Sequence, residues 1–323
     1  MNRFQSLYYS IVLLAIISCK PRNTVGKETP TTTSQTIELV AQEWPGQEPK
    51  SFQMPVYRGL DKLEFANREK ITLNDTDLVM GMMIDDTQIA LPLLYLEGFE
   101  VANLTLNDEH YLVTWCGLVG SAQMFEGNIT GDTQGFDFGR ALINSNLLMV
   151  DRKTQSVWNQ LSTKAIHGDL KETPLNLLPT LQTTWGYWKE KYPNSKVLIN
   201  KDTTGAAFPS LVFERPFYTS WQPKDGNFHM VEKHQPKNLG MGIELGGISV
   251  YFPLEELFKR DSSMVYQLAG KNITIHFDQL GLTAWAEDSM GMGTAIPTTL
   301  VYQWAWQNFH PNTVIFKSNG EGM

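Results

Sequence analysis

The chain has 323 residues, of which 42% are hydrophobic, and its 34 acidic and 26 basic residues give a formal net charge of −8. This composition excludes disorder over most of the chain and supplies enough apolar side chains for a buried core. The acidic balance also argues against nucleic-acid binding, which needs a basic surface for the phosphates. We therefore expect a folded protein that does not bind nucleic acids.

The first nineteen residues have the pattern of a secretion signal. A single basic residue, Arg3, precedes an apolar run over residues 7–17 that is too short to cross a membrane comfortably. The run ends in Ile-Ile-Ser-Cys, which resembles the bacterial lipobox, whose cysteine receives a diacylglyceryl group and then a further acyl chain such as palmitate. We expect a signal peptide over residues 1–18 and a membrane anchor at Cys19, because two or three acyl chains hold a protein stably on a bilayer. An uncleaved anchor, or plain secretion with an incidental cysteine, are the alternatives.

Residues 19–43 are expected to form a flexible tether. They are rich in Thr, Ser, Pro and Gly and contain almost no large apolar side chain before Ile37, so they cannot offset chain entropy by burial. No acidic cluster follows Lys20, and neither a retention signal nor a surface-export signal is evident. The outer membrane of a bacterial cell envelope, facing the periplasm, is the default expectation.

Cysteine usage leaves one thiol for the folded body. The chain has two cysteines. If Cys19 carries lipid, Cys116 is the remaining thiol and no intramolecular disulfide can form. The stability of the body must therefore come from its core.

Two stretches of the body align with each other without a gap. Residues 80–96 and 241–257 each begin with Met-Gly, continue through an apolar run and a tight polar turn, and reach a second run that ends in Pro-Leu. Further along, Trp188 and Trp306 each stand five residues before a proline, in Tyr-Pro-Asn-Ser and His-Pro-Asn-Thr. We infer an internal duplication. A chance coincidence of short Gly, Pro and aromatic strings is the alternative.

The duplication predicts an α+β, β-rich body in which two structurally similar repeats pack about a pseudo-two-fold axis. The first repeat would cover residues 44–200 with a long insertion, and the second, shorter repeat would cover residues 201–318 and pack on the first as one body. Short helices are expected over residues 184–191 and 299–309, where aromatic residues recur at helical spacing.

Five motifs follow one another in a fixed order in the body. They are Ile-Ala-Leu-Pro-Leu-Leu from Ile89, Val-Thr-Trp-Cys-Gly-Leu-Val-Gly-Ser-Ala from Val113, the run from Asn144 to Gln160, Ala-Ile-His-Gly-Asp-Leu from Ala165, and Thr-Thr-Trp from Thr183. In order and spacing they resemble the uncharacterised family called domain of unknown function 3179, over roughly residues 75–318. The family's own name implies no established activity, so the resemblance indicates no reaction.

The chain departs from the family pattern at polar positions. Where the family typically has Cys-x-x-Cys, this chain has Cys116 followed by Val119, and one thiolate alone forms neither a redox dithiol nor half of a metal site. Phe99 stands where the family usually has His, while Glu100 and Asn103 match the family. Redox or metal activity is therefore a weaker expectation here than for the family.

Cys116 is the candidate catalytic residue. It follows a strand-like run and precedes a glycine, which is a common place for reactive groups. It could act as a nucleophile, as a peroxide-sensing sulfenate or as one ligand of a soft metal, or it could be a small buried thiol beside Trp115. His276 aligns with Trp115 in the second repeat, so a pseudo-two-fold axis could pair its imidazole with this thiol.

The candidate binding residues come from the matched motifs and from this alignment. They are Glu100, Asn103, Asn146, Asp151, Arg152, His167, Trp185 and His276. Each has an ordinary structural alternative, such as a solvated ion pair for Asp151 and Arg152 or packing at the repeat interface for Trp185. The methionines of residues 80–83 and 290–292, with His229, Met230 and His234, would suit copper(I), although a Met-rich core is the commoner cause. We expect no resident metal or cofactor.

Standard catalytic signatures are absent from the sequence, including the Gly-x-Ser-x-Gly elbow, His-Glu-x-x-His and the glycine-rich phosphate-binding loops. The sequence therefore predicts a lipid-anchored protein that acts as a ligand-binding or accessory module of the cell envelope, with an unidentified ligand. The competing hypothesis is a thiol-dependent redox or metal-handling protein that uses Cys116. The sequence does not decide whether the protein is an enzyme.

Overall fold

The computed structural model describes residues 35–41, 50–97, 99–129, 131–133, 135–199, 237–289 and 294–318. The expected signal peptide, Cys19 and most of the expected tether lie outside these residues, as does the repeat boundary expected at residue 200. The last part of the expected tether range is a strand, β1 (Gln35–Ala41), which pairs with β2. Within the described ranges, no helix has both the length and the apolarity needed to cross a membrane.

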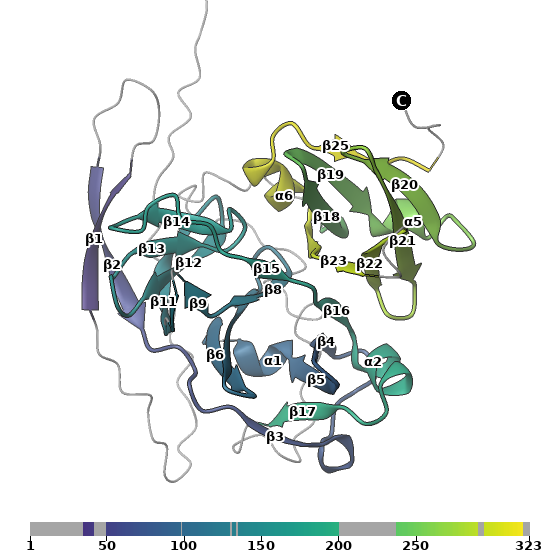
Figure 1. The fold of residues 1–323 in the computed structure, drawn as a ribbon, viewed down its shortest axis with the longest axis horizontal. Helices are drawn as coiled ribbons and strands as arrows, with labels where there is room; N and C mark the ends of the chain where they lie inside the picture. The colour runs from purple at the N-terminus through teal and green to yellow at the C-terminus, as the bar shows by residue number, and fades with distance from the viewer. Residues whose placement is uncertain are drawn as a thin grey trace, which may run out of the picture.

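The body consists of small β-sheets arranged as a five-bladed β-propeller (Figure 1). The expected α+β fold with two repeats about a pseudo-two-fold axis is therefore wrong. Tight hairpins join most neighbouring strands, and the helices of the described residues are only three to seven residues long. These helices are η1 (Arg68–Lys70), α1 (Leu93–Leu96), α2 (Trp185–Lys191), α5 (Leu254–Leu257) and α6 (Gln303–Phe309).

The first half of the chain contributes to a six-stranded sheet, a two-stranded ribbon and a four-stranded sheet. The six-stranded sheet has the spatial order β1 (Gln35–Ala41), β2 (Lys50–Tyr57), β11 (Phe136–Ile143), β12 (Asn146–Asp151), β13 (Val157–Asn159) and β14 (Lys164–His167). The ribbon pairs β9 (Asn128–Ile129) with β10 (Asp132–Thr133). The four-stranded sheet has the order β15 (Leu177–Leu178), β8 (Ser121–Glu126), β7 (Glu109–Cys116) and β6 (Val101–Leu106).

Three further sheets complete the described body. One has five strands in the order β16 (Leu181–Thr184), β4 (Leu78–Ile84), β5 (Thr87–Pro92), β17 (Lys196–Ile199) and β3 (Glu64–Asn67). The next has the order β24 (Thr299–Tyr302), β18 (Leu239–Leu245), β19 (Ile248–Pro253) and β25 (Val314–Ile315). The last has the order β20 (Met264–Leu268), β21 (Lys271–Asp278), β22 (Thr283–Asp288) and β23 (Ala295–Ile296).

The two stretches that align in the sequence form one hairpin in each of two separate sheets, β4–β5 and β18–β19. In both sheets the hairpin has an antiparallel neighbour, β16 or β24, on one side and a parallel neighbour, β17 or β25, on the other. The aligned sequences thus correspond to two blades with the same strand order. The fold prediction failed because it extended this local correspondence to two halves of the whole body.

Hairpin turns explain why these residues form short antiparallel strands. Residues Asn107-Asp108, Asn144-Ser145 and Gly246-Gly247 all have positive φ at both turn positions. Two such residues form the type I′ turn, whose twist matches that of the flanking strands. Gly, Asn and Asp adopt this left-handed backbone most readily, so the polar turns of the sequence close the hairpins.

The glycine of each Met-Gly pair makes room for an indole ring. A Cβ atom on Gly81 would overlap the ring of Trp188 from α2, and one on Gly242 would overlap the ring of Trp306 from α6. In each case the indole lies directly on the strand backbone. The two sequence motifs that seemed independent, Met-Gly and the tryptophan before the proline, therefore form one packing unit that seats a helix on a sheet.

The residues after each tryptophan complete this packing unit. Trp188 Nε1 donates a hydrogen bond of 2.9 Å to Ser195 Oγ, and its ring lies 4.2 Å from that of Tyr192. Trp306 Nε1 donates one of 3.0 Å to Thr313 Oγ1. The Ser or Thr of the Pro-Asn-Ser/Thr motif thus satisfies the buried indole N–H. The helix expected over residues 184–191 is confirmed as α2, whereas only the later part of the range 299–309 is helical, as α6.

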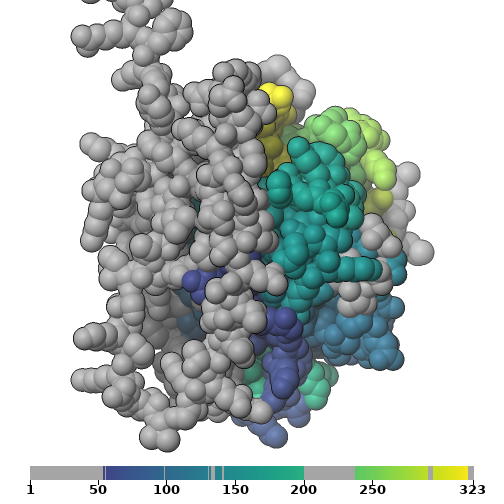
Figure 2. All heavy atoms as spheres, turned by 90° about the vertical axis from the view of Figure 1, so that its left-hand side faces the viewer, coloured from purple at the N-terminus to yellow at the C-terminus, as the bar shows by residue number. Residues whose placement is uncertain are grey.

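Apolar side chains fill the spaces between neighbouring sheets. Met80 and Trp115 lie in a cluster between the β4–β5 sheet and the β6–β8 sheet, and Phe252 and Ile275 lie in a second cluster between the two C-terminal sheets. A third cluster joins the six-stranded sheet to the β6–β8 sheet and to the sheet that contains β19 and β24. In the side view, surface from the middle of the chain (teal) lies directly beside surface from its C-terminal part (green) (Figure 2). The sheets thus share their cores rather than folding separately.

The Gly81–Trp188 packing can be tested by a double-mutant cycle. Gly81→Ala should lower the free energy of unfolding by about 2 kcal/mol, because the added methyl group must displace a buried indole. Trp188→Leu removes the ring, so the double variant should lose less stability than the sum of the two single variants. Chemical denaturation of the three variants and the parent chain measures this. Strictly additive losses would contradict the contact.

Candidate functional site

Cys116 lies at the end of β7 inside the core, with 1% of its surface exposed. Its Sγ makes a long contact of 3.9 Å to the carbonyl oxygen of Ser145. Burial raises the pKa of the thiol to about 12, and the charge of Glu100 adds to this rise, while the backbone N–H of Val119 offsets part of it. The thiol is therefore protonated at neutral pH and shielded from solvent, which does not favour a nucleophile or a metal ligand.

Glu100 is the candidate residue whose charge acts on this thiol. It precedes β6 with a left-handed φ of 53°, and its carbonyl oxygen accepts a hydrogen bond of 2.9 Å from the backbone N–H of Trp115. Burial raises the pKa of its carboxyl to about 8, and the nearby charge of Glu97 adds to the rise. Glu100 and Cys116 thus lie together, but both are mainly uncharged at pH 7.

Val119, where the resemblance noted in the sequence implied a second cysteine, is also part of the core. Val119 is fully buried and belongs to the same apolar cluster as Cys116 and Phe125. Its apolar side chain packs in the same cluster as the Cys116 thiol. The structure therefore shows a packed interior around Cys116 and Val119.

Asn146 lies in a buried network of amides and hydroxyls. Its Nδ2 donates a hydrogen bond of 2.7 Å to Gln160 Oε1, and its Oδ1 accepts one of 3.0 Å from Asn159 Nδ2. Gln160 in turn donates to Thr114 Oγ1 at 2.9 Å and accepts from Ser121 Oγ at 2.9 Å. Because these bonds join β12 to β7 and β8, Asn146 serves to hold two sheets together.

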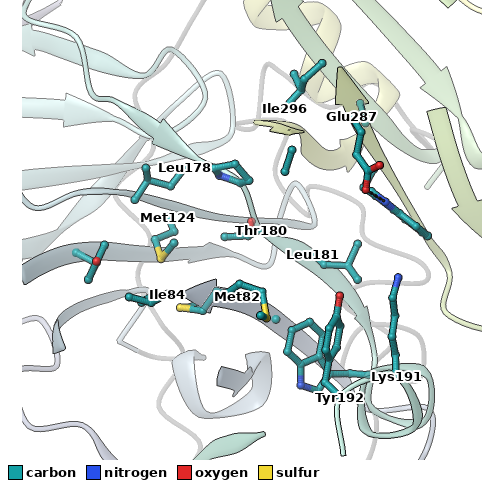
Figure 3. Close-up of a pocket in the computed structure, with 18 of the residues that line it drawn as sticks. Met82, Ile84, Met124, Leu178, Thr180, Leu181, Lys191, Tyr192, Glu287 and Ile296 are labelled. Carbon is teal, nitrogen blue, oxygen red and sulfur yellow. Dashed lines mark hydrogen bonds between the residues drawn. The ribbon is translucent and has the colours of Figure 1, made fainter. Parts of the chain in front are cut away.

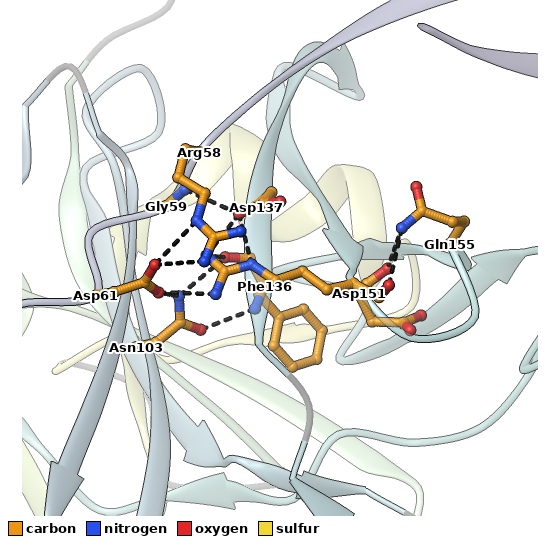
Figure 4. Close-up of polar contacts among 9 residues, drawn as sticks. Arg58, Gly59, Asp61, Asn103, Phe136, Asp137, Asp151 and Gln155 are labelled. Carbon is orange, nitrogen blue, oxygen red and sulfur yellow. Dashed lines mark hydrogen bonds and ion pairs between the residues drawn. The ribbon is translucent and has the colours of Figure 1, made fainter. Parts of the chain in front are cut away.

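Asn103 and Arg152 meet in a second polar network (Figure 4). Arg152 forms ion pairs of 2.8 Å with Asp61 and 2.7 Å with Asp137. Asn103 donates to Asp61 Oδ1 at 2.9 Å and accepts from the backbone N–H of Phe136 at 2.8 Å. The network ties β6 and β11 to the segment before β3. The two aspartates were not identified from the sequence, and they already pair with the guanidinium that was a candidate binding group.

Asp151 lies next to Arg152 in sequence but has different partners. Its buried carboxylate accepts hydrogen bonds of 2.6 Å from Thr154 N, 3.0 Å from Ser156 N and 3.0 Å from Trp158 Nε1. These bonds shape the turn between β12 and β13. The carboxylate is thus used for folding, and the expected Asp151–Arg152 pair does not form a common site.

The remaining candidates are dispersed. His167 ends β14 opposite Val157, and Trp185 begins α2 as a buried core residue. His276 lies on β21, where its ring stacks on Trp285 with centroids 5.1 Å apart and its Nε2 lies 3.3 Å from a carboxylate oxygen of Glu287. These contacts differ from those of Cys116, which lies in another sheet, so the structure does not pair this imidazole with the thiol.

A cleft of about 440 Å³ opens between β4, β8, β16, α2 and β22 (Figure 3). Its lining is mainly apolar and aromatic, and it includes Met82, Met124, Leu181, Trp188, Tyr192 and Ile296. The packing of Trp188 on Gly81, described above, forms part of its wall. The contact that seats α2 on the sheet thus also borders the cleft.

One side of this cleft carries the polar groups of Lys191, Trp285 and Glu287. Lys191 Nζ lies 4.4 Å from the ring centroid of Trp285, on which His276 stacks. Trp285 Nε1 donates a hydrogen bond of 3.3 Å to Glu287 Oε1. Figure 3 shows Lys191 and Tyr192 extending from α2 toward the strand that carries Glu287. A basic and an acidic side chain therefore flank an aromatic ring at one side of an apolar cleft.

Only a few of the residues that line this cleft were identified from the sequence. Trp188 was singled out for its motif and Met82 as a possible copper ligand or core residue, whereas Lys191 and Glu287 were not singled out. Lys191 follows Trp188 by three residues and so lies near the same face of α2, which is the one local signal that pointed to it.

Metal ligands do not gather in the described part of the chain, where no group of three or more His, Cys, Asp or Glu side chains could hold a metal ion. Of the residues considered for copper(I), His229, Met230, His234 and Met290–Met292 lie outside the described residues. Met80 and Met82 are both core residues, and Met82 also borders the cleft.

Among known protein families, one family model matches most of the chain. The model described as "Protein of unknown function (DUF3179)" matches residues 59–313, a range that includes both the cleft and Cys116. No curated protein and no solved structure matches the chain.

The raised pKa of Glu100 predicts a specific pH dependence of stability. Between its ordinary pKa of 4.5 and about 8, the folded state keeps this carboxyl protonated while the unfolded state loses the proton. The free energy of unfolding should therefore fall as pH rises through this range, by at most about 1.4 kcal/mol per pH unit. Glu100→Gln should remove this part of the fall, whereas Glu190→Gln, at an exposed position, should keep it. Denaturation curves at several pH values measure the difference, and an unchanged slope in Glu100→Gln would contradict the burial of this carboxyl.

Proposed function

Since the chain belongs to the family described as protein of unknown function DUF3179, whose description names no activity, we propose a function from the geometry of the site: the body binds a small organic ligand in the cleft between β4, β16, α2 and β22. The observation that carries this proposal is a 440 Å³ cleft with an apolar and aromatic lining and a few polar groups at one side. Small-molecule sites in proteins have this size and this distribution of side chains.

The lining suits reversible binding. The methionines Met82, Met83 and Met124 are flexible and polarisable, so they can adapt to the shape of an apolar ligand. Met83 is 48% exposed, so it presents apolar surface at the cleft. Tyr192 and Trp285, which are partly exposed, add aromatic surface. A ligand in the cleft would remove this apolar surface from water.

The thiol-dependent alternative has less support. Cys116 is buried, its pKa is raised to about 12, and it does not line the cleft. A reaction at this thiol would require the core around Val119 to open. The structure therefore favours the binding hypothesis over a redox or metal-handling function.

The sequence supports a location for this binding protein. Its apolar run followed by Ile-Ile-Ser-Cys indicates lipidation at Cys19, and the residues after it indicate a tether. We propose that the body is held in this way at a bacterial membrane, with the cleft presented in the cell envelope.

Binding in the cleft can be tested with N-phenyl-1-naphthylamine, a neutral dye whose fluorescence rises in apolar sites. The probe should bind the acyl-free chain, made as Cys19→Ala and purified without detergent. Thr180→Trp should weaken binding about tenfold or more, because the indole would fill the cleft from a partly buried loop position. Val265→Trp is the control, since Val265 is 63% exposed and lies outside the cleft. Equal binding by the parent chain and Thr180→Trp would refute the cleft as the site.

Lipidation is tested by growing the bacterium with an alkyne-labelled palmitate analogue. The parent chain should carry the label and sediment with membranes, and Cys19→Ala should lose both properties. Cys116→Ala is the matched control, because it removes the other cysteine and should keep the label. Labelling of the Cys19→Ala chain would overturn the anchor.

A further inference from the structure

We propose that the ligand of the cleft is a small organic anion with a flat apolar body, whose charged group binds at Lys191; this inference rests on the proposed binding function of the cleft. It names the chemical class of the ligand and the residue that selects it. Three features support it: the environment of Lys191, the partners of the acidic groups in the cleft, and the arrangement of the aromatic rings.

Lys191 is the only basic side chain among the described residues that line the cleft. Its ammonium group lies 4.4 Å from the ring centroid of Trp285, 5.5 Å from that of Tyr187 and 5.7 Å from that of Tyr192. It donates a hydrogen bond of 3.3 Å to Tyr187 OH. Within the described chain its contacts are with neutral groups, and no ion pair to it is formed. The rings hold a positive charge at the cleft without neutralising it.

The neighbouring lysine of the same helix shows the ordinary arrangement. Lys189 Nζ forms an ion pair with Asp75, which lies outside the cleft. The two lysines at the end of α2 therefore differ in their partners. Lys189 has a carboxylate partner, whereas Lys191 has aromatic partners and lines the cleft. Lys189 is thus a matched control for the role of Lys191.

The acidic side chains of the cleft already have partners. Glu287 accepts a hydrogen bond from Trp285 Nε1 and lies 3.3 Å from His276 Nε2. Asp85 accepts one of 2.9 Å from Asn107 Nδ2. These donors satisfy hydrogen-bonding capacity of the two carboxylates, whereas Lys191 is the one basic side chain of the described lining that can pair with an anion.

The ring arrangement favours a flat ligand body. The His276 ring stacks on Trp285 at an interplanar angle of 14°, and the Lys191 ammonium group lies 4.4 Å from the centroid of the same indole ring. Trp188 is held against Tyr192, with ring centroids 4.2 Å apart. Trp188 itself is 1% exposed, so the ring surface open to a ligand comes from Tyr192 and Trp285, which are partly exposed. A flat apolar body can contact these two rings with little loss of conformational freedom.

Two dyes with the same aromatic body separate the charge from the shape. One is 8-anilinonaphthalene-1-sulfonate, and the other is N-phenyl-1-naphthylamine, which lacks the sulfonate. In the acyl-free chain, Lys191→Met should weaken binding of the anionic dye about fivefold, which corresponds to one partly exposed charge pair, and should change binding of the neutral dye by less than about twofold. Lys189→Met should leave both affinities unchanged, and Lys191→Arg should keep the anionic dye bound.

The outcomes separate the two hypotheses. If Lys191→Met weakens both dyes equally, or neither, while Thr180→Trp weakens both, the cleft binds ligands but Lys191 does not select an anion, and this inference falls alone. If Thr180→Trp weakens neither dye, the proposed function fails and the inference falls with it. Near-ultraviolet circular dichroism of Lys191→Met should match that of the parent chain, which distinguishes a lost charge from a disturbed fold.

Discussion

The packing of the Trp188 ring against the backbone of Gly81 holds α2 on the β4–β5 sheet. A side chain of any size at residue 81 would occupy the space of the indole. The ring therefore needs a glycine at this position, and it fills the space that the glycine leaves. Once α2 lies there, Tyr192 and Lys191 extend from its end toward β22 of another sheet. This contact forms part of one wall of the cleft and holds the helix end that carries the cation beside Trp285.

Polar groups in the interior have a different task. The amides around Asn146 and Gln160 join β12 to β7 and β8, and Arg152 with Asp61 and Asp137 ties β11 to the segment before β3. Buried polar groups are tolerated when each has its hydrogen-bond partners, and here they connect sheets that share little regular pairing. The family motifs around Cys116 thus belong to the core that positions the cleft.

Local features of the fold could be predicted from the sequence, and its assembly could not. The Met-Gly hairpins, the polar turns and α2 depend on contacts within short segments, whose residue patterns are visible in the chain. The arrangement of the sheets depends on contacts between distant segments, and the α+β expectation failed for that reason. Whether Cys116 was buried or reactive was left open because burial also depends on such contacts. The cleft draws Met82, Met124, Lys191 and Glu287 from four separate segments, and no local spacing links them.

Hydrogen–deuterium exchange of the acyl-free chain, with and without N-phenyl-1-naphthylamine, tests the location of the binding site most directly. Binding in the cleft predicts slower exchange in peptides that cover residues 81–85, α2 and β22, with little change elsewhere. Protection confined to the peptides around Cys116, or no protection at all, would contradict a ligand site built on the Gly81–Trp188 contact.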